Sequence, residues 1–228
     1  MNRGMEWLGR TLVIAPHPDD EVLGAGGTMA KLSESGHEVF VAVITVGKPP
    51  AYSAEYVARV RAEAASAHDL LGVKEAIWLE QPAAGLSEVK NAVLNSAIGD
   101  VVQHVAPQTI LVPFPGDIHV DHQLVFQSVL VASRPHQAVY PRTIMAYETL
   151  SETNWNAPYI TPPFVPNVYL DISNHLERKI AAMRKFSSQL RSSPHERSVE
   201  SLRSLAVMRG ATVHREAAES FVLVRHVA

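Results

Sequence analysis

The sequence contains no cysteine among its 228 residues. This absence excludes disulfide bonds, iron–sulfur clusters, thiolate zinc sites and cysteine nucleophiles, so any bound metal must be held by histidine, aspartate or glutamate. Charged residues are also scarce, at 19% of the chain, while 46% of the residues are hydrophobic. That balance is typical of a folded globular protein and argues against a disordered chain.

Long hydrophobic runs are absent as well. The run Val39–Val46 is far shorter than the ~18 to 20 residues that a membrane span needs. Residues 1–10 lack the apolar stretch and the small-residue cleavage site of a signal peptide. Lysine and arginine form no dense run interleaved with aromatic residues, which gives nucleic-acid binding little support. We therefore expect a cytoplasmic protein with no membrane span and no nucleic-acid partner.

The net charge of -3 is unevenly distributed along the chain. Residues 177–228 hold ten lysines and arginines against five acidic residues, whereas residues 1–176 hold ten against eighteen. A solvated basic helical face is the simpler interpretation of the basic end. A basic element that closes over an anionic substrate is the alternative.

Short apolar runs rich in β-branched residues alternate with segments of helical spacing through the first 150 residues. Such alternation predicts parallel strands joined by right-handed crossovers. The fold class is therefore α/β, with a Rossmann-like, mainly parallel, doubly wound sheet and helices on both faces. The predicted strands are Leu12–Ala15, Val39–Val46, Ala76–Leu79, Thr109–Phe114 and Thr143–Tyr147, and the predicted helices are Glu21–Ser35, Ala54–Leu71, Val89–Val105 and Val120–Ser133.

After residue 150 the pattern changes. Residues 157–166 are rich in proline, which indicates an irregular surface loop. We expect one domain over residues 1–228, with a core at 1–150 and a C-terminal extension at 151–228 packed on it. The elements expected in the extension are strands at Val168–Asp171 and Phe221–His226 and helices near His175–Leu190 and His195–Arg209.

Two polar segments follow predicted strands at their carboxyl ends. Pro16-His17-Pro18-Asp19-Asp20-Glu21 follows the first strand, and the run Pro113–His122 overlaps the end of the fourth. These two strands are neighbours at the switch point of a doubly wound sheet, so the two segments should face each other where ligands bind. One carboxylate would suffice to cap the helix that begins there, and the additional acidic groups therefore indicate a metal.

Histidine and carboxylate side chains in these segments fit a catalytic zinc site. Three protein ligands with an open fourth position define such a site. His17, Asp20 and one of His119 or His122 supply the set. The remaining histidine, with Asp121 beside it, is then free to act in catalysis.

Two other classes of protein compete with this hypothesis. Gly24–Gly27 faintly resembles a dinucleotide fingerprint, but it falls inside the first helix instead of forming the strand-to-helix turn. These glycines are better explained by close packing of the helix on the sheet. Two histidines and one carboxylate would also suit the Fe(II) of an oxygenase, so that alternative stays open.

The two segments together resemble the metal-dependent sugar de-N-acetylases of the PIG-L (LmbE-like) family. The resemblance implies that a Zn²⁺ ion, or Fe²⁺ or another divalent metal, is bound by His17, Asp20 and His122. It also implies that Asp19 is the general base and that His119, oriented by Asp121, lies near the substrate carbonyl. The likeness continues along nearly the whole chain, at Thr45, Gly47, Glu63, Leu71-Gly72, Val168–Ile172, Ser188-Gln189 and Ala218–Phe221.

The activity implied by this resemblance is hydrolysis of the N-acetyl group of an N-acetylglucosamine-type small molecule, which gives acetate and a free amino sugar. Relatives often assemble, so a homo-oligomer is an expectation. An amidase of the same family acting on a larger acyl group and a non-catalytic metal- or sugar-binding module are the alternatives.

The substrate is less well defined by the sequence. Family members often carry an arginine where this chain has Val60, between Arg59 and Arg61. Tyr147 follows the pattern of an active-site tyrosine of some relatives. The sequence leaves open whether Tyr147, Arg59, Arg61 or the loop 157–166 contacts the substrate.

Overall fold

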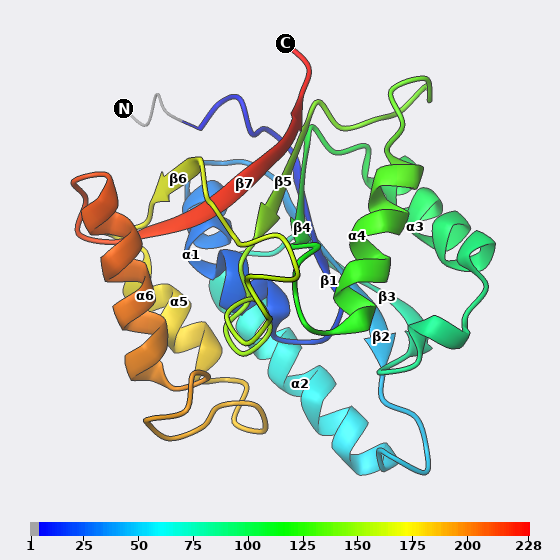
Figure 1. The fold of residues 1–228 in the computed structure, drawn as a ribbon, viewed down its shortest axis with the longest axis horizontal. Coiled ribbons are helices and arrows are strands. Elements are labelled where there is room, and N and C mark those ends of the chain that lie inside the picture. Colours follow the sequence, from blue (N-terminus) through cyan, green and yellow to red (C-terminus); the bar gives the residue numbers. More distant parts are fainter. Residues whose placement is uncertain (1–4) are drawn as a thin grey trace.

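The computed structural model describes residues 5–228, so the first four residues of the amino-terminal segment considered above lie outside the described residues. Strands and helices alternate through the first two thirds of the chain (Figure 1). In chain order the elements are β1 (Thr11–Ala15), α1 (Asp20–Glu34), β2 (Val39–Val46), α2 (Ala54–Leu71), β3 (Glu75–Pro82), the 3-10 helix η1 (Leu86–Glu88), α3 (Asn91–Val105), β4 (Thr109–Pro113), α4 (Val120–Ala132), β5 (Thr143–Tyr147), β6 (Val168–Asp171), α5 (Leu176–Met183), α6 (Val199–Thr212) and β7 (Ala218–His226).

The strands form one seven-stranded sheet in the order β3-β2-β1-β4-β5-β7-β6. Strands β1 to β5 pair in parallel, whereas β7 runs antiparallel to both β5 and β6. The predicted α/β class and the mainly parallel, doubly wound sheet are confirmed. Strands β1 and β4 are neighbours, which places the ends of the two polar segments side by side.

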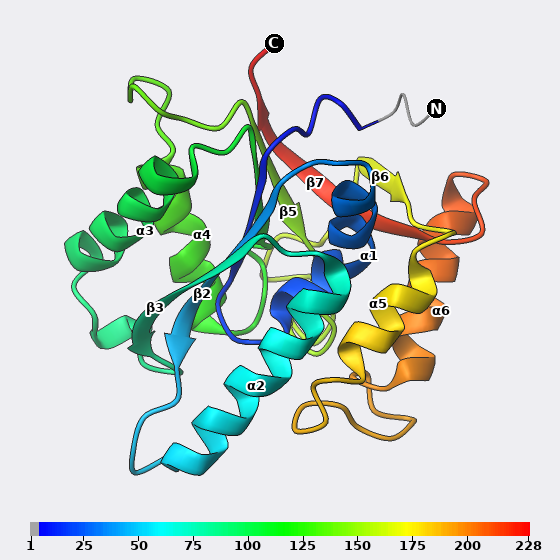
Figure 2. The same cartoon turned by 180° about the vertical axis from the view of Figure 1, so that it is seen from behind.

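Helices cover both faces of the sheet, α1, α2, α5 and α6 on one side and α3 and α4 on the other (Figure 2). Side chains on β1 alternate between the two resulting cores: Val13 packs with residues of the first group of helices and Leu12 with residues of the second. Burial on both faces explains why β1, β2, β4 and β5 are continuous apolar runs. Strand β3 lies at the edge and is partly exposed. No helix within residues 5–228 is long and apolar enough to cross a membrane.

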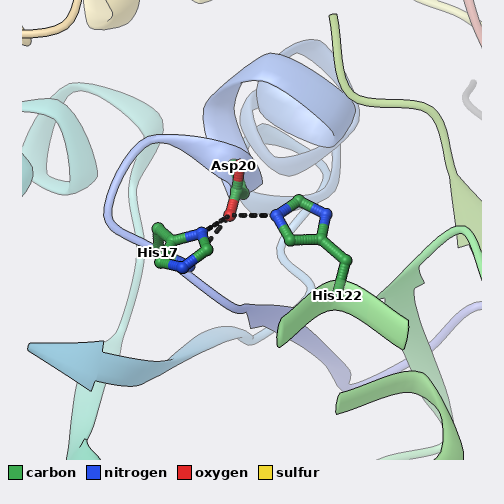
Figure 3. A group of neighbouring side chains, drawn as sticks. All are labelled: His17, Asp20 and His122. Atoms are coloured by element: carbon green, nitrogen blue, oxygen red, sulfur yellow. Dashed lines mark hydrogen bonds and ion pairs between the residues drawn. The ribbon is translucent and has the colours of Figure 1, made fainter. Parts of the chain in front are cut away.

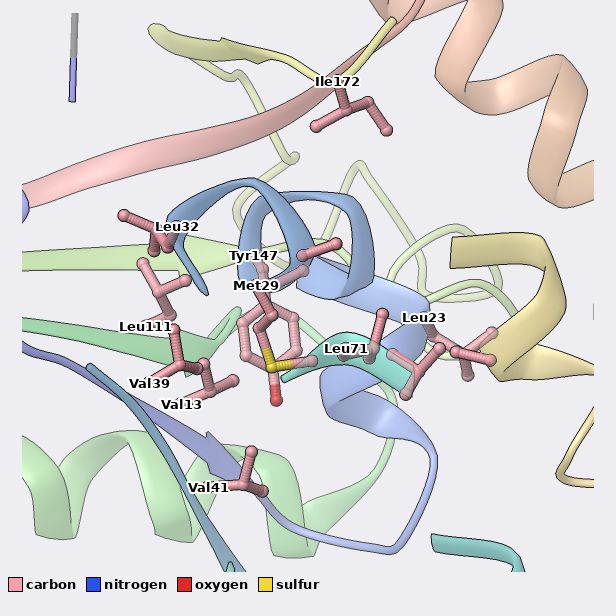
Figure 4. Close-up of a cluster of buried hydrophobic side chains, with 14 of the residues drawn as sticks. Val13, Leu23, Met29, Leu32, Val39, Val41, Leu71, Leu111, Tyr147 and Ile172 are labelled. Atoms are coloured by element: carbon pink, nitrogen blue, oxygen red, sulfur yellow. The ribbon is translucent and has the colours of Figure 1, made fainter. Parts of the chain in front are cut away.

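Tyr147 is a core residue in this structure (Figure 4). Its hydroxyl donates a hydrogen bond to the carbonyl oxygen of Ile14 at 2.7 Å. A Cβ atom on Gly24 would lie 2.1 Å from the Tyr147 ring, so α1 can approach the sheet here only because residue 24 is a glycine. The close helix-to-sheet contact supports the packing interpretation of the glycines in α1.

Element boundaries after residue 170 differ from the sequence-based expectation. Helix α5 ends at Met183 instead of continuing to Leu190, and α6 begins at Val199 instead of near His195. The second boundary has a local cause, because the Ser198 hydroxyl accepts the backbone N–H of Ser201 at 3.2 Å and so caps the helix. Turns occupy much of the intervening segment and place its polar side chains beside the carboxyl ends of the strands.

Candidate metal centre

The first half of the candidate centre lies where β1 turns into α1. Asp19 occupies the N-cap position of α1 without a side-chain capping hydrogen bond, and its φ of 114° lies in the left-handed region that non-glycine residues seldom adopt. Such backbone strain tends to occur at functional sites. Asp20 then opens α1, and its carboxylate accepts the backbone N–H of His17 at 2.8 Å. The positive end of the helix dipole favours the ionised form of a carboxylate at this position.

The second half lies where β4 leads into α4. His119 caps that helix, because its Nδ1 accepts the backbone N–H of Asp121 at 3.1 Å. His122 lies in the first turn and is completely buried. The residues that the sequence singled out after β4 therefore hold fixed positions at the start of a helix.

His17, Asp20 and His122, which we call the metal centre, converge on one point (Figure 3). The Oδ2 atom of Asp20 lies 3.3 Å from His17 Nδ1 and 3.2 Å from His122 Nε2. One ligand atom from each residue falls within 4.8 Å of the other two, a spacing that fits around a single ion. Imidazole nitrogen and carboxylate oxygen are the donors expected for zinc in a chain without cysteine.

Two buried atoms of the metal centre have no hydrogen-bond partner in the described part of the chain. They are Oδ1 of Asp20 and Nε2 of His122. Buried polar atoms are rarely left unsatisfied, and an ion held here would give His122 Nε2 a partner other than Asp20 Oδ2, which lies 3.2 Å away in an ion pair. A second group, His17 with His119 and Asp121, also clusters. Its Asp121 carboxylate, however, already accepts the backbone N–H groups of residues 84 and 86 at 2.8 and 3.2 Å.

Neighbouring carboxylates orient both histidines of the metal centre. Nδ1 of His122 lies 2.8 Å from Oδ2 of Asp117, whose other oxygen accepts the Thr153 hydroxyl at 2.6 Å. Nε2 of His17 lies 3.1 Å from Oδ2 of Asp121. In each ring the second nitrogen faces Asp20, which is the arrangement that metal-binding histidines need. The sequence pointed to Asp121 as the residue that orients His119; its carboxylate instead bonds His17, and only its backbone N–H contacts His119.

The acidic surroundings hold protons on these histidines when no metal is bound. Burial by itself lowers the pKa of His17, but hydrogen bonds with Asp121 and Asp20 raise it to about 9. Burial also opposes the charged form of His122, and the Asp20 and Asp117 carboxylates raise its pKa to about 10. A metal ion must therefore displace protons when it binds.

Asp19 is held by an arginine that sequence reasoning missed. Nη1 of Arg197 donates to Oδ2 of Asp19 at 2.9 Å, and Nη2 donates to Glu152 Oε1 at 3.3 Å. The Ser151 hydroxyl fixes the third guanidinium donor at 2.8 Å. Burial raises the pKa of Asp19 to about 8, although Arg197 opposes the shift. Arg197 belongs to the basic C-terminal segment, where no motif marks it; Asp117 could have been found, because it lies within the second polar segment.

A cavity of about 190 Å³ opens beside the metal centre, and His17, Asp19 and His119 line it. Asp20 and His122 are buried and are not among its lining residues. Arg61 lines the cavity, but within the described residues Arg59, Tyr147 and the loop 157–166 do not. Arg59 instead lies over the Tyr56 ring, at 5.3 Å from the ring centroid.

Comparison with known proteins defines the family to which this chain belongs. The model of the PIG-L family, described as GlcNAc-PI de-N-acetylase, matches residues 12–133. This match covers more than half of the chain, and the chain therefore belongs to the PIG-L family. Diacetylchitobiose deacetylase of Thermococcus kodakarensis is 28% identical over 221 residues, which cover 88% of this chain and 78% of the relative. The predicted family and the predicted class of enzyme, a deacetylase that hydrolyses an amide bond, are confirmed.

Solved structures agree with the fold. The N,N'-diacetylchitobiose deacetylase of Pyrococcus horikoshii superimposes with a TM-score of 0.76 at 25% identity, over 96% of this chain and 85% of that one. A conserved protein of Thermus thermophilus, TT1542, gives a TM-score of 0.78 at 22% identity, over 96% of both chains. The latter likeness concerns the fold alone.

Proposed function

We propose that this chain is a zinc-dependent hydrolase that removes the N-acetyl group from an N-acetylglucosamine-type small molecule. One observation carries the proposal: His17, Asp20 and His122 offer one ligand atom each within 4.8 Å of one another, and His17 lines the same cavity as Asp19 and His119. Family membership supports the same chemistry, since two of the proteins named above are diacetylchitobiose deacetylases.

A divalent ion held by the metal centre would polarise the acyl oxygen and lower the pKa of a coordinated water from about 15.7 to about 7. Asp19 is not one of the ligands, and it faces the cavity where the amide would lie. We assign to it the role of general base, which takes the proton of the attacking water. The Asp19 carboxylate, held by Arg197 beside the cavity, is positioned to take this proton and later return it.

His119 is placed to act as a neutral hydrogen-bond donor. Burial, with the adjacent His17, lowers its pKa, so the ring is uncharged at neutral pH. Its Nδ1 accepts the backbone N–H of Asp121, which leaves the ring proton on Nε2. This N–H would stabilise the negative charge that develops on the acyl oxygen, a contribution worth about 2.7 to 4 kcal/mol in comparable enzymes.

The bond changes balance with these residues alone and one water. The water oxygen bonds to the acyl carbon while its proton passes to Asp19. The carbon–nitrogen bond then breaks as Asp19 returns that proton to the departing amine. The products are a free amino sugar and acetic acid, which gives up its remaining proton to become acetate.

The test is acetate release from a panel of N-acetylglucosamine conjugates by zinc-loaded protein and by protein stripped with a chelator. We expect acetate and free amine in equal amounts from the loaded protein and none from the stripped protein. Loading with Fe²⁺ under anaerobic conditions compares the two metals directly. A larger acid in the mass spectrum of the products would indicate the amidase instead, and metal binding without any product would indicate a binding module.

A further inference from the structure

The cavity beside the metal centre extends well beyond the acetamide-sized space at its floor. Its far side is built from the end of β2, the first turns of α2 and the middle of β3. Three aromatic side chains, Tyr52, Tyr56 and Trp78, which we call the aromatic wall, line that side together with Val57 and Val60. The catalytic groups and the aromatic wall therefore share one cavity, and a single ligand can contact both.

The rings of the aromatic wall are held in place by their neighbours. The Tyr52 and Tyr56 rings stack with centroids 5.8 Å apart and planes inclined by 28°. The Tyr52 ring lies so close to the backbone of Gly47 that a Cβ atom there would sit 2.6 Å from it. The Tyr56 hydroxyl accepts a hydrogen bond from the Gln189 side-chain amide at 2.8 Å. Rings fixed before a ligand arrives lose little conformational entropy on binding.

The cavity has little unpaired positive charge. Within the described residues its lining includes two arginines and no lysine. Arg61 pairs with Glu80 and lies over the Trp78 ring, 4.6 Å from the ring centroid. Arg197 is engaged by Asp19 and Glu152. A phosphate or diphosphate would compete with Glu80 for Arg61 and with Asp19 and Glu152 for Arg197, and it would lie near carboxylates of its own sign, which disfavours an anionic substrate.

We infer that the aromatic wall binds the substituent carried by the N-acetylated sugar, and that this substituent is neutral and presents a flat apolar face. An aryl group and the C–H face of a second pyranose ring share that chemistry, and both stack on aromatic side chains. The inference rests on the proposed function, because the acetamide at the metal centre sets which part of the ligand reaches the wall. It replaces the idea that the basic C-terminal segment supplies a free cation for an anionic substrate.

The test compares kcat/KM for four substrates: N-acetylglucosamine, its phenyl glycosides, its disaccharide and its 1-phosphate. Tyr52→Ala removes one ring of the aromatic wall, Tyr52→Phe keeps the ring, and Tyr159→Ala is the matched control because Tyr159 is 99% exposed and lies outside the cavity lining. We expect Tyr52→Ala to lower kcat/KM for the phenyl glycoside or the disaccharide about fivefold, mainly through KM. N-acetylglucosamine itself should change by less than about twofold.

The pattern of losses decides the inference. The inference is supported if Tyr52→Phe and Tyr159→Ala keep near-wild-type kcat/KM and if the 1-phosphate is the poorest substrate. The kcat/KM values for the phenyl glycoside and the disaccharide then show whether an aryl group or a second sugar ring is preferred. An equal loss on all four substrates, no loss on any, or preference for the 1-phosphate overturns it. If no substrate releases acetate, the proposed function fails. Calorimetric binding of the phenyl glycoside to zinc-loaded wild-type and Tyr52→Ala protein then decides the role of the wall independently.

Discussion

Asp117→Asn should weaken zinc binding without removing any metal ligand. The Asp117 carboxylate is completely buried and lies 2.8 Å from His122 Nδ1, so no water can replace the charged acceptor. Loss of such a partner typically weakens metal affinity about 10- to 100-fold, which is about 1.4 to 2.8 kcal/mol. Burial places this substitution in the upper half of that range. Competition titration with a chromophoric chelator measures the change in zinc affinity.

Two further variants show whether a loss of zinc affinity in Asp117→Asn comes from a misoriented His122 or from general unfolding. Asp100→Asn makes the same chemical change at an exposed position on α3 and should leave zinc affinity unaltered. Thr153→Val removes the hydroxyl that donates to Asp117 but keeps the carboxylate, so its loss should be smaller. Thermal unfolding in excess chelator checks that each apoprotein is folded. Wild-type zinc affinity in folded Asp117→Asn protein would refute the orienting role.

Contacts of Asp19, of Gly24 and of the two histidines of the metal centre give three further predictions. Arg197→Ala should lower kcat about 10-fold or more, because a hydrogen bond to a charged group is worth about 1.5 to 3 kcal/mol. Its zinc content should stay at the wild-type level. Partial recovery of kcat in Arg197→Lys or with added guanidinium would show that Arg197 positions Asp19, whereas a misfolded variant would not recover. Gly24→Ala should destabilise the fold by about 1 to 3 kcal/mol in denaturant unfolding, since its methyl group would overlap the Tyr147 ring, and an unchanged midpoint would contradict that packing. Apparent zinc affinity should rise between pH 6 and 8 by about tenfold per pH unit for each proton that zinc displaces. The reason is that His17 and His122 have pKa values of about 9 and about 10 without metal. A zinc affinity that does not change with pH would contradict the protonation of these histidines.

Patterns that depend on local sequence predicted much of the fold and which side chains lie together at its candidate metal centre. Strands such as Val39–Val46 are buried on both faces, so their apolar runs were readable without a structure. The convergence of His17 and Asp20 with one of His119 or His122 followed from one topological rule, that β1 and β4 flank the switch point, and the family resemblance singled out His122.

Contacts between distant segments were not predictable in the same way. Arg197 reaches Asp19 across 178 positions, from a segment of turns that a helical pattern had been expected to fill. Asp121 is adjacent to His122 and close to His119 in sequence, yet its carboxylate bonds His17 on the other strand end. Sequence spacing identifies which residues reach one edge of the sheet, but side-chain direction decides which of them touch.

The central claim is that Asp19 transfers protons beside a metal that other residues hold. Asp19→Asn tests it most directly, because asparagine also tolerates the left-handed backbone found at this position. Acetate release and metal content are measured on the same purified sample, with His122→Ala as the variant that should lose the metal. We predict that Asp19→Asn retains wild-type zinc content and loses about 10²- to 10⁴-fold in kcat. Wild-type acetate release from zinc-loaded Asp19→Asn protein would contradict the account.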